Sequence, residues 1–354
     1  MKRGKDGSQW EIACANHSDS SNSNEPTWCT TTSTILNASS VFGRHTRCYA
    51  ARCKVGERIE EGIVKDSWSL PRDKQKSGAD AAYVPDEAYN LRLIAATLGK
   101  EKQSFLYPKA VFSGSVMFRN GKECVKDDTS KIFEHDETEE EKLTREHSRI
   151  FVTPVGDYLD TVENEEELVL VLADAMECHN AILTKCRLLH RDISVNNILV
   201  VRKFEGKSVR RPVKGLLIDF DHAISIDQQS SGYATRSGTL PFMSIHNLEA
   251  HASQRTALDD WESLLYVICW LGTYGVNHRD RETVKHNKVA PIEKWRSGSM
   301  PIIANEKRTQ MHNLDTFRSN ILAGFQDQMA NARDHHIHWF KIKTLVQTSP
   351  VPTD

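Results

Sequence analysis

The sequence predicts an α+β fold, with strands concentrated in the first part of the chain and helices in the rest. Three observations support this class. Residues 41–50 read as strand, turn and strand around Gly43. Residues 85–99 carry apolar side chains at helical spacing, with an acid near the start and Gly99 just beyond the end. Residues 165–185 repeat the helical spacing over a longer stretch.

Three segments are too polar to contribute to a folded core. Residues 1–40 are rich in Ser, Thr and Asn, which predicts a disordered polar tail. Residues 119–149 surround the acidic run 134–142, and we expect a mobile insertion there, or alternatively an acidic surface that binds a partner. Residues 348–354 are predicted to form a short C-terminal tail.

The composition argues against several classes of partner. The 354 residues include 46 Lys and Arg against 48 Asp and Glu, for a net charge of −2, so no global field attracts nucleic acid or an anionic membrane. The longest apolar runs, 168–173 and 264–271, are too short to span a bilayer, and no secretory signal follows Met1. We therefore expect an intracellular protein, cytoplasmic or nuclear, and the sequence predicts no oligomeric state.

Eight cysteines are scattered along the chain without a C-x-x-C pair. This spacing argues against a zinc module and against a disulfide framework. We expect all eight to be reduced thiols.

The stretch 188–201 contains the most informative motif. His190, Arg191 and Asp192 are followed by Asn197, which gives the pattern H-R-D-x-x-x-x-N of a protein kinase catalytic loop. The spacing suits the chemistry, because a carboxylate must meet the attacking hydroxyl while an amide five residues later reaches a metal on the phosphates. Asp192 is the candidate base and Asn197 the candidate metal ligand.

A second motif follows at the expected distance. Residues 215–218 form an apolar strand that ends in Asp219 and Phe220, where the kinase pattern has its Mg²⁺-binding aspartate. A helix-to-strand connector with ordinary turn residues is the alternative interpretation of a lone His-Arg-Asp. Two motifs in the correct order favour the kinase interpretation.

Lys65 and Glu87 are candidates for the phosphate-holding ion pair of that pattern. Lys65 is predicted at the end of a third strand, whereas its rival Lys54 falls on the second strand of the hairpin. Glu87 lies four residues before Leu91, on the inward face of its helix, and its alternative role is to complement the helix dipole. Gly43 fits a hairpin turn as well as a cover over phosphates, because it stands alone where G-x-G-x-x-G is expected.

The second half contains supporting residues. Asp260 begins an apolar helix and is expected to hold the catalytic loop from beneath, whereas His179 is predicted to be a packed or partly exposed helix residue. The Ser/Thr-rich stretch 225–239 matches an activation segment that phosphorylation could order. The histidines of 335–338 are predicted to be a surface cluster rather than a metal site.

Together these stretches resemble the fungal-type protein kinase family over about residues 41–328. The resemblance rests on Gly43-Arg44, Val64-Lys65-Asp66-Ser67-Trp68, Glu87, His190-Arg-Asp-Ile-Ser with Asn197, Ile218-Asp-Phe-Asp, Gly238-Thr-Leu-Pro-Phe-Met and Asp260-Trp-Glu-Ser-Leu. It implies a bilobal protein-kinase-like fold, with a small antiparallel-sheet N-lobe with one helix at 41–155 and a larger, mainly helical C-lobe at 156–347.

The resemblance also implies ATP with Mg²⁺ as cofactors, a protein substrate and transfer to its Ser or Thr hydroxyls. On that basis Lys65 and Gly43 contact ATP phosphates and Glu87 pairs with Lys65. Asp192 is the base beside Arg191, and Asn197 and Asp219 bind the nucleotide's metal.

Three departures from the general kinase pattern bear on activity. Ser194 occupies the place of a lysine on the transferring phosphate, so a cation that stabilises transition-state charge is missing. Asp221 replaces a glycine and its backbone freedom. His246 stands where a glutamate pairs with an arginine of the lower lobe.

Three functions are consistent with these features. The first is an ATP-dependent protein kinase. The second is a pseudokinase that binds nucleotide or a protein partner without phosphotransfer. The sparse glycine turn, Ser194 and Asp221 favour the pseudokinase, whereas the intact set Lys65, Asp192, Asn197 and Asp219 opposes it. The third is a small-molecule phosphotransferase. The activation-segment-like stretch 225–243 argues against that third function, because a small substrate needs no peptide-docking platform.

Overall fold

The computed structural model describes most of the chain, and the chain divides into two compact units. Unit 1 comprises Met1–Ala95 and Pro108–Val155, and unit 2 comprises Ala96–Tyr107 and Gly156–Asp354. The described residues are 2–3, 9–14, 27–37, 45–69, 86–120, 123–129, 145–204, 207–208, 212–228, 237–249, 255–275 and 290–325.

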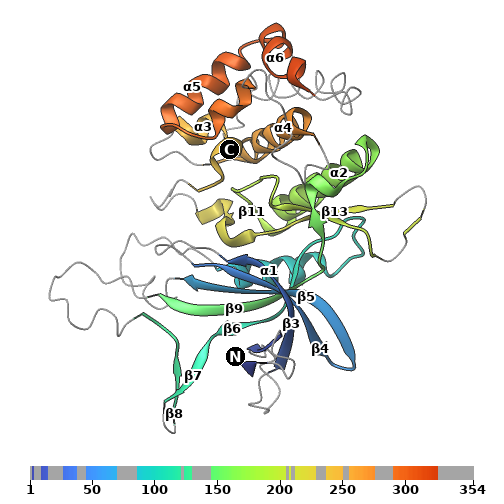
Figure 1. Cartoon of the computed structure of the whole chain (residues 1–354), viewed down its shortest axis with the longest axis vertical. Coiled ribbons are helices and arrows are strands. Elements are labelled where there is room, and N and C mark those ends of the chain that lie inside the picture. The colour runs from blue at the N-terminus through green and yellow to red at the C-terminus, as the bar shows by residue number, and fades with distance from the viewer. Residues whose placement is uncertain are drawn as a thin grey trace, which may run out of the picture. The chain divides into compact units, whose positions relative to one another are not determined.

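Unit 1 contains a curved antiparallel sheet of seven strands (Figure 1). In sheet order the strands are β1 (Lys2–Arg3), β2 (Trp10–Cys14), β3 (Thr27–Asn37), β4 (Arg47–Val55), β5 (Arg58–Ser69), β9 (Glu146–Thr153) and β6 (Lys109–Ser115). One helix, α1 (Glu87–Leu98), begins in this unit. The antiparallel sheet and its helix are therefore confirmed.

The prediction of a disordered tail over residues 1–40 is wrong where the structure describes this segment, because Lys2–Arg3 forms β1 and two longer stretches also form strands. Trp10–Cys14 and Thr27–Asn37 form β2 and β3, and the Trp10 N–H donates to Thr31 Oγ1 at 2.9 Å. Only one face of these strands is buried, at Ile12, Cys29 and Thr31. A polar average composition therefore does not prevent strand formation when threonine and alternate apolar residues cover a core.

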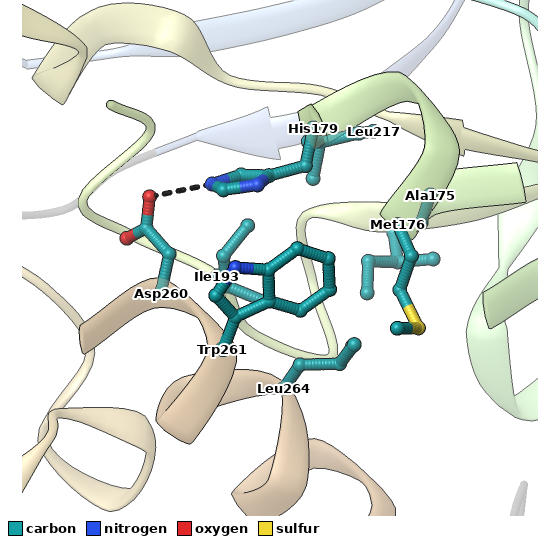
Figure 2. Close-up of a pocket in the computed structure, with 9 residues that line it drawn as sticks. Ala175, Met176, His179, Ile193, Leu217, Asp260, Trp261 and Leu264 are labelled. Carbon is teal, nitrogen blue, oxygen red and sulfur yellow. Dashed lines mark hydrogen bonds and ion pairs between the residues drawn. The ribbon is translucent and has the colours of Figure 1, made fainter. Parts of the chain in front are cut away.

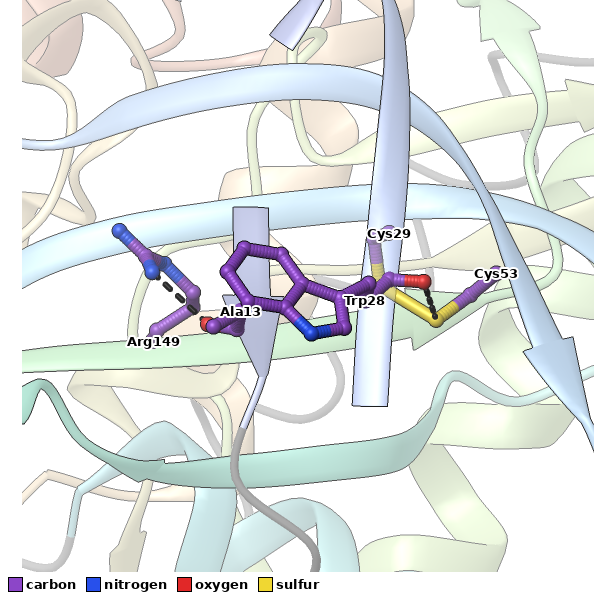
Figure 3. Close-up of a disulfide and its surroundings, with 5 residues drawn as sticks. All are labelled: Ala13, Trp28, Cys29, Cys53 and Arg149. Carbon is purple, nitrogen blue, oxygen red and sulfur yellow. Dashed lines mark hydrogen bonds between the residues drawn. A yellow bond between two sulfur atoms is a disulfide. The ribbon is translucent and has the colours of Figure 1, made fainter. Parts of the chain in front are cut away.

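The expectation that all cysteines are reduced is also wrong. Cys29 of β3 and Cys53 of β4 form a disulfide, with their Cα atoms 4.4 Å apart (Figure 3). They lie directly opposite each other in the β3–β4 ladder, at the short separation of a cross-strand pair. Spacing along the sequence carries no signal of this pairing, because strand register creates it.

The prediction of a mobile insertion over 119–149 is wrong for its two ends, which form strands. Its beginning lies in a hairpin of β7 (Met117–Asn120) and β8 (Glu123–Lys126), and its end lies in β9. Its acidic centre at 134–142 falls outside the described residues. The sequence predicts that the C-terminal end of this stretch is exposed, because it contains charged residues such as Arg149. In the structure Arg149 is buried in β9, where Asp66 of β5 neutralises its charge.

Unit 2 combines small sheets with helices. Its strands are β10 (Asp157–Tyr158), β11 (Leu188–Leu189), β12 (Ile198–Val201), β13 (Lys214–Leu217) and β14 (Ile224–Ser225), paired as β10-β12-β13 and β11-β14. Its helices are α2 (Glu165–Ala181), which continues in a π-helical turn over Ile182–Cys186, α3 (Ile245–Glu249), α4 (Ala257–Tyr274), α5 (Met300–Gln310) and α6 (Leu314–Asn320). Within the described residues, no helix is both long enough and apolar enough to cross a membrane.

Helix α2 packs directly against strand β13, which carries the second kinase-like motif. A Cβ atom at Gly215 would lie 2.0 Å from the Val171 carbonyl oxygen, so only glycine permits this approach. Asp174 of α2 also accepts a hydrogen bond from the Gly215 N–H at 2.9 Å. This contact fixes the strand that leads to Asp219.

Helix α4 is buried along most of its length, as predicted, but it begins two residues before Asp259. Thr256 precedes the helix, and its N–H donates to the Asp259 carboxylate at 2.8 Å. Of the predicted C-terminal core, Trp295, Phe317, Ile321 and Phe325 are buried and Leu314 is half-buried. The histidines of 335–338 and the tail at 348–354 lie outside the described residues.

Candidate active site

In unit 1, Lys65 and Glu87 form the predicted ion pair. Lys65 Nζ lies 2.7 Å from a Glu87 carboxylate oxygen, and both side chains are nearly buried. Lys65 projects from the face of β5 opposite to Val64 and Asp66, because side chains alternate along a strand. The rival Lys54 is exposed on β4, and Gly43 lies outside the described residues. Strand β5 continues to Ser69, four residues beyond Lys65, where the sequence predicts its end.

The Lys-Asp-Ser-Trp stretch joins β5 to β9 residue by residue. Asp66, Ser67 and Trp68 lie directly opposite Arg149, Ser148 and His147, respectively. Arg149 makes a two-pronged contact to Asp66 at 2.5 and 2.8 Å, the two serine hydroxyls lie 3.0 Å apart, and the Trp68 ring stacks on His147 at 4.7 Å. The motif thus fixes the strand that carries Lys65.

In unit 2, Asp260 at the start of α4 holds the catalytic loop. Its two carboxylate oxygens accept the backbone N–H groups of His190 and Arg191, each at 3.0 Å. Burial alone would raise the pKa of Asp260, but its hydrogen bond with His179 and the nearby charges hold that pKa below its usual range. The predicted contact from beneath the loop is present.

His179 contributes to this support rather than to a ligand site. Figure 2 shows its ring pointing from α2 toward Asp260, with the Trp261 ring beside it. His179 Nε2 lies 2.8 Å from Asp260 Oδ2, and the Trp261 ring meets the imidazole edge-on at 5.3 Å. The sequence places His179 on a packed helix face, which is correct, but gives no sign of its partner.

His190 connects the catalytic loop to the strand that precedes Asp219. Its Nδ1 accepts the Asp192 N–H at 3.3 Å and its Nε2 donates to the Ile218 carbonyl at 2.9 Å. These partners select the neutral ring protonated at Nε2. Burial lowers the pKa of His190, against the opposing charges of Asp260 and Asp192. The Phe220 ring packs edge-on against the imidazole at 4.7 Å.

The lowered pKa of His190 predicts a loss of stability in mild acid. An unfolded histidine titrates near about 6.5, so below that pH the unfolded chain binds a proton that the folded chain resists. As the pH falls below this value, His190 should lower the free energy of unfolding by up to about 1.4 kcal/mol per pH unit. This loss should end once the pH reaches the lowered pKa that His190 has in the folded protein. Between pH 7 and 5.5, melting temperature should fall more steeply for the wild type than for His190→Gln; parallel curves would contradict the assignment.

The carboxylate of Asp192 is held on both oxygens. Oδ1 accepts the Thr239 N–H at 3.0 Å and the Thr239 hydroxyl at 2.9 Å, while Asn197 Nδ2 donates to Oδ2 at 3.2 Å. Asn197 Nδ2 also donates to the Asp192 carbonyl at 2.8 Å. These bonds fix the direction of the carboxylate, which is the geometric requirement for a general base.

Asp219 has left-handed backbone geometry, with φ of 67°. The residue before it, Ile218, donates its N–H to the Asn197 carbonyl at 2.9 Å, so the two predicted metal ligands are joined through the backbone. Asp221 lies in the 3₁₀ turn Phe220–His222 and is not among the positive-φ residues. The backbone freedom that a glycine would bring is therefore needed at Asp219 rather than at Asp221.

Arg191 has a supporting role in this structure. Its backbone is left-handed, with φ of 69°, and its carbonyl accepts Arg255 Nη1 at 3.0 Å. Arg255 Nη2 also donates to the Ser237 carbonyl at 2.7 Å. Burial, with the nearby charge of Arg191, lowers the pKa of Arg255 to about 10, so this guanidinium remains charged at neutral pH. Arg255 therefore joins the loop to the segment that begins at Ser237.

The other two departures also have structural contexts. His246 Nδ1 lies 3.1 Å from a carboxylate oxygen of Asp259, so the histidine that replaces the glutamate itself contacts an acid of α4. The Ser194 hydroxyl is buried and has no hydrogen-bond partner among the described residues. Of the predicted activation segment, residues 229–236 lie outside the described residues.

The structure thus brings Lys65 to Glu87 in unit 1, and Asp192 to Asn197 with Asp219 joined through Ile218 in unit 2. Sequence reasoning missed Thr239 and Arg255. Thr239 lies inside the Gly-Thr-Leu-Pro-Phe-Met stretch, which could have identified it as a residue with a role. Arg255 gave no comparable signal.

A sequence model of fungal protein kinases matches residues 85–272, which is more than half of the chain. The chain belongs to the fungal protein kinase family. The matched range contains Glu87, Asp192, Asn197 and Asp219, whereas Lys65 precedes it.

Among solved structures, this fungal-type kinase is similar to PK-1, the kinase of Cydia pomonella granulovirus. The two are 10% identical, the match covers 82% of this chain and 93% of the viral chain, and the TM-score is 0.40. No curated protein matches the sequence.

Proposed function

We propose that this protein transfers the γ-phosphate of Mg-ATP to serine or threonine hydroxyls of a protein substrate. The observation that carries the proposal is the carboxylate of Asp192, oriented by Thr239 on one oxygen and by Asn197 on the other. In phosphoryl transfer the enzyme mainly positions the reactants and stabilises charge, so a fixed base at the hydroxyl is a central requirement.

The residues of unit 2 fit the metal that ATP carries. Mg²⁺ prefers oxygen ligands, and Asp219 and Asn197 offer a carboxylate and an amide oxygen. Asn197 uses its Nδ2 for both hydrogen bonds to Asp192, which leaves Oδ1 out of those contacts. A metal bound there would neutralise charge on the phosphates, while Asp192 accepts the proton of the attacking hydroxyl.

The ion pair of unit 1 supports the binding of phosphate. Glu87 fixes the direction of the Lys65 ammonium, and the position of Lys65 on a central strand limits its movement. A lysine held in this manner is suited to the α- and β-phosphates of ATP.

Transfer of labelled γ-phosphate to a basic protein substrate tests the proposal. The wild type and Asp315→Asn, which alters an exposed carboxylate, should transfer label, whereas Asp219→Asn should lose most of it because a metal ligand is removed. Acid hydrolysis of the product distinguishes phosphoserine and phosphothreonine from phosphotyrosine. Label on tyrosine alone would contradict the proposed specificity.

The pseudokinase alternative is favoured by one specific observation. Ser194 replaces a cation near the transferred phosphate, and its buried hydroxyl has no partner among the described residues. If no label moves while Mg-ATP still raises the melting temperature, the site binds nucleotide without transfer, and this alternative replaces the proposal.

A further inference from the structure

We infer that Lys307 is a positioning residue for Asp192, acting through the turn that begins at Thr239. This inference rests on the proposed phosphotransfer and assigns a residue to it that lies outside the catalytic motifs. Lys307 is on α5 and its side chain is fully buried, at 0% exposure. A buried ammonium is costly unless its N–H groups find acceptors, so its contacts identify what it holds.

Two backbone carbonyls of one short segment accept hydrogen bonds from Lys307. Its Nζ donates to the Pro241 oxygen at 2.9 Å and to the Met243 oxygen at 2.6 Å. The turn Leu240–Phe242 uses other carbonyls internally, because the N–H groups of Phe242 and Met243 donate back to Thr239 and Leu240. Lys307 therefore donates to the carbonyls of Pro241 and Met243, which accept neither of these two hydrogen bonds within the turn.

Two aromatic rings also lie close to the ammonium. Nζ lies 3.8 Å from the centre of the Tyr266 ring and 5.1 Å from that of the Trp295 ring. Ring faces attract cations most strongly where water is excluded. Trp295 is fixed by a 3.0 Å hydrogen bond from its Nε1 to Gln310, and the two rings meet edge-on. The cation is thus held in one place rather than free to follow the turn.

The turn transmits this position to the candidate base. Thr239 begins the turn, and its N–H and hydroxyl both donate to Asp192 Oδ1. Immediately after the turn, the Ser244 hydroxyl donates to Asp259 at 2.5 Å and the Ile245 N–H donates to Glu262 at 3.1 Å. The segment 239–245 is therefore fixed at both ends, and Lys307 holds its middle.

The first arm of the test measures this hold without any activity. Amide hydrogen exchange is compared between the wild type, Lys307→Met and Lys294→Met, whose lysine is exposed and pairs with Glu306. Exchange in 237–249 should accelerate about tenfold or more in Lys307→Met alone, with α2 unchanged, because only the turn loses its cation. Unchanged exchange in 237–249 overturns the inference.

The second arm measures transfer. Lys307→Met should lower kcat roughly 10- to 100-fold with the KM for ATP unchanged, since misplacing a catalytic group has costs of this order. In a Thr239→Val background the same substitution should have a much smaller effect, because the two residues act in series. Independent, additive losses would show a merely structural role and overturn the inference.

Two safeguards keep these results interpretable. If Lys307→Met does not fold, Lys307→Arg is used in both arms, because it keeps the charge but presents a planar group. The same pattern is then expected at smaller amplitude, and its absence overturns the inference. If the wild type transfers no phosphate, the proposed function fails, and the exchange arm still decides whether Lys307 holds the turn.

Discussion

Asp192→Asn is expected to lower kcat for phosphotransfer about 100- to 10,000-fold, the usual contribution of a positioned general base. The change is nearly isosteric. An amide oxygen at the place of Oδ1 still accepts both hydrogen bonds from Thr239, so the loop keeps that support. The new amide nitrogen takes the place of Oδ2, where it faces the Nδ2 donor of Asn197. Because an amide nitrogen cannot accept a proton, the variant has no general base.

The control for this variant is Asp315→Asn, which neutralises an exposed carboxylate of the same unit. Its kcat should equal that of the wild type. Because Asp192 is not proposed to bind metal, Asp192→Asn should retain the rise in melting temperature that Mg-ATP produces. A full kcat in Asp192→Asn would remove the general base from the proposed mechanism.

Arg149→Met is expected to destabilise unit 1 by about 3–5 kcal/mol, the cost of removing one partner of a buried ion pair. Arg149 binds both carboxylate oxygens of Asp66, and its Nη1 also donates to the Ala13 carbonyl at 2.8 Å, which joins β9 to β2 (Figure 3). Arg149 holds the pKa of Asp66 below its usual range despite burial, which would raise it. The variant leaves a buried carboxylate with the 3.5 Å contact to His147.

Two measurements test this effect. Urea denaturation gives the free energy of unfolding, and amide hydrogen exchange in β5 and β9 locates the loss of stability in unit 1. The matched control is Arg52→Met, since Arg52 pairs with Glu61 in the same sheet at side-chain exposures of 61% and 59%. That exposed pair should contribute no more than about 1 kcal/mol. The double variant Asp66→Leu with Arg149→Met should recover much of the loss, because no unpaired charge remains. Equal effects of Arg149→Met and Arg52→Met would contradict the assigned role of the buried pair.

The predicted part of the site depends on short-range pattern. Asp192 and Asn197 are five residues apart, and their contact follows once the loop forms. Thr239 reaches Asp192 from 47 residues away and Lys307 reaches Pro241 from 66 residues away. No local periodicity predicts contacts of that range, because they arise from packing between elements.

The fold shows the same division. Helices α1 and α2 could be predicted because apolar spacing and terminal residues act within a few turns. Strands β2 and β3 could not, because each buries only alternate side chains and depends on its neighbours for hydrogen bonds. Cys29 and Cys53, or Asp66 and Arg149, meet only when strand register places them opposite each other.

The sequence by itself determined the order of the motifs, the helices that begin and end at recognisable residues, and the residues Asp192, Asn197 and Asp219 of one continuous stretch of chain. The tertiary structure decided which charges are buried and what neutralises them. Asp66 with Arg149, Asp260 with His179, and Lys307 with two carbonyls each combine distant residues. The free energy of burying a charge depends on the groups that surround it in space, and local sequence does not specify those groups.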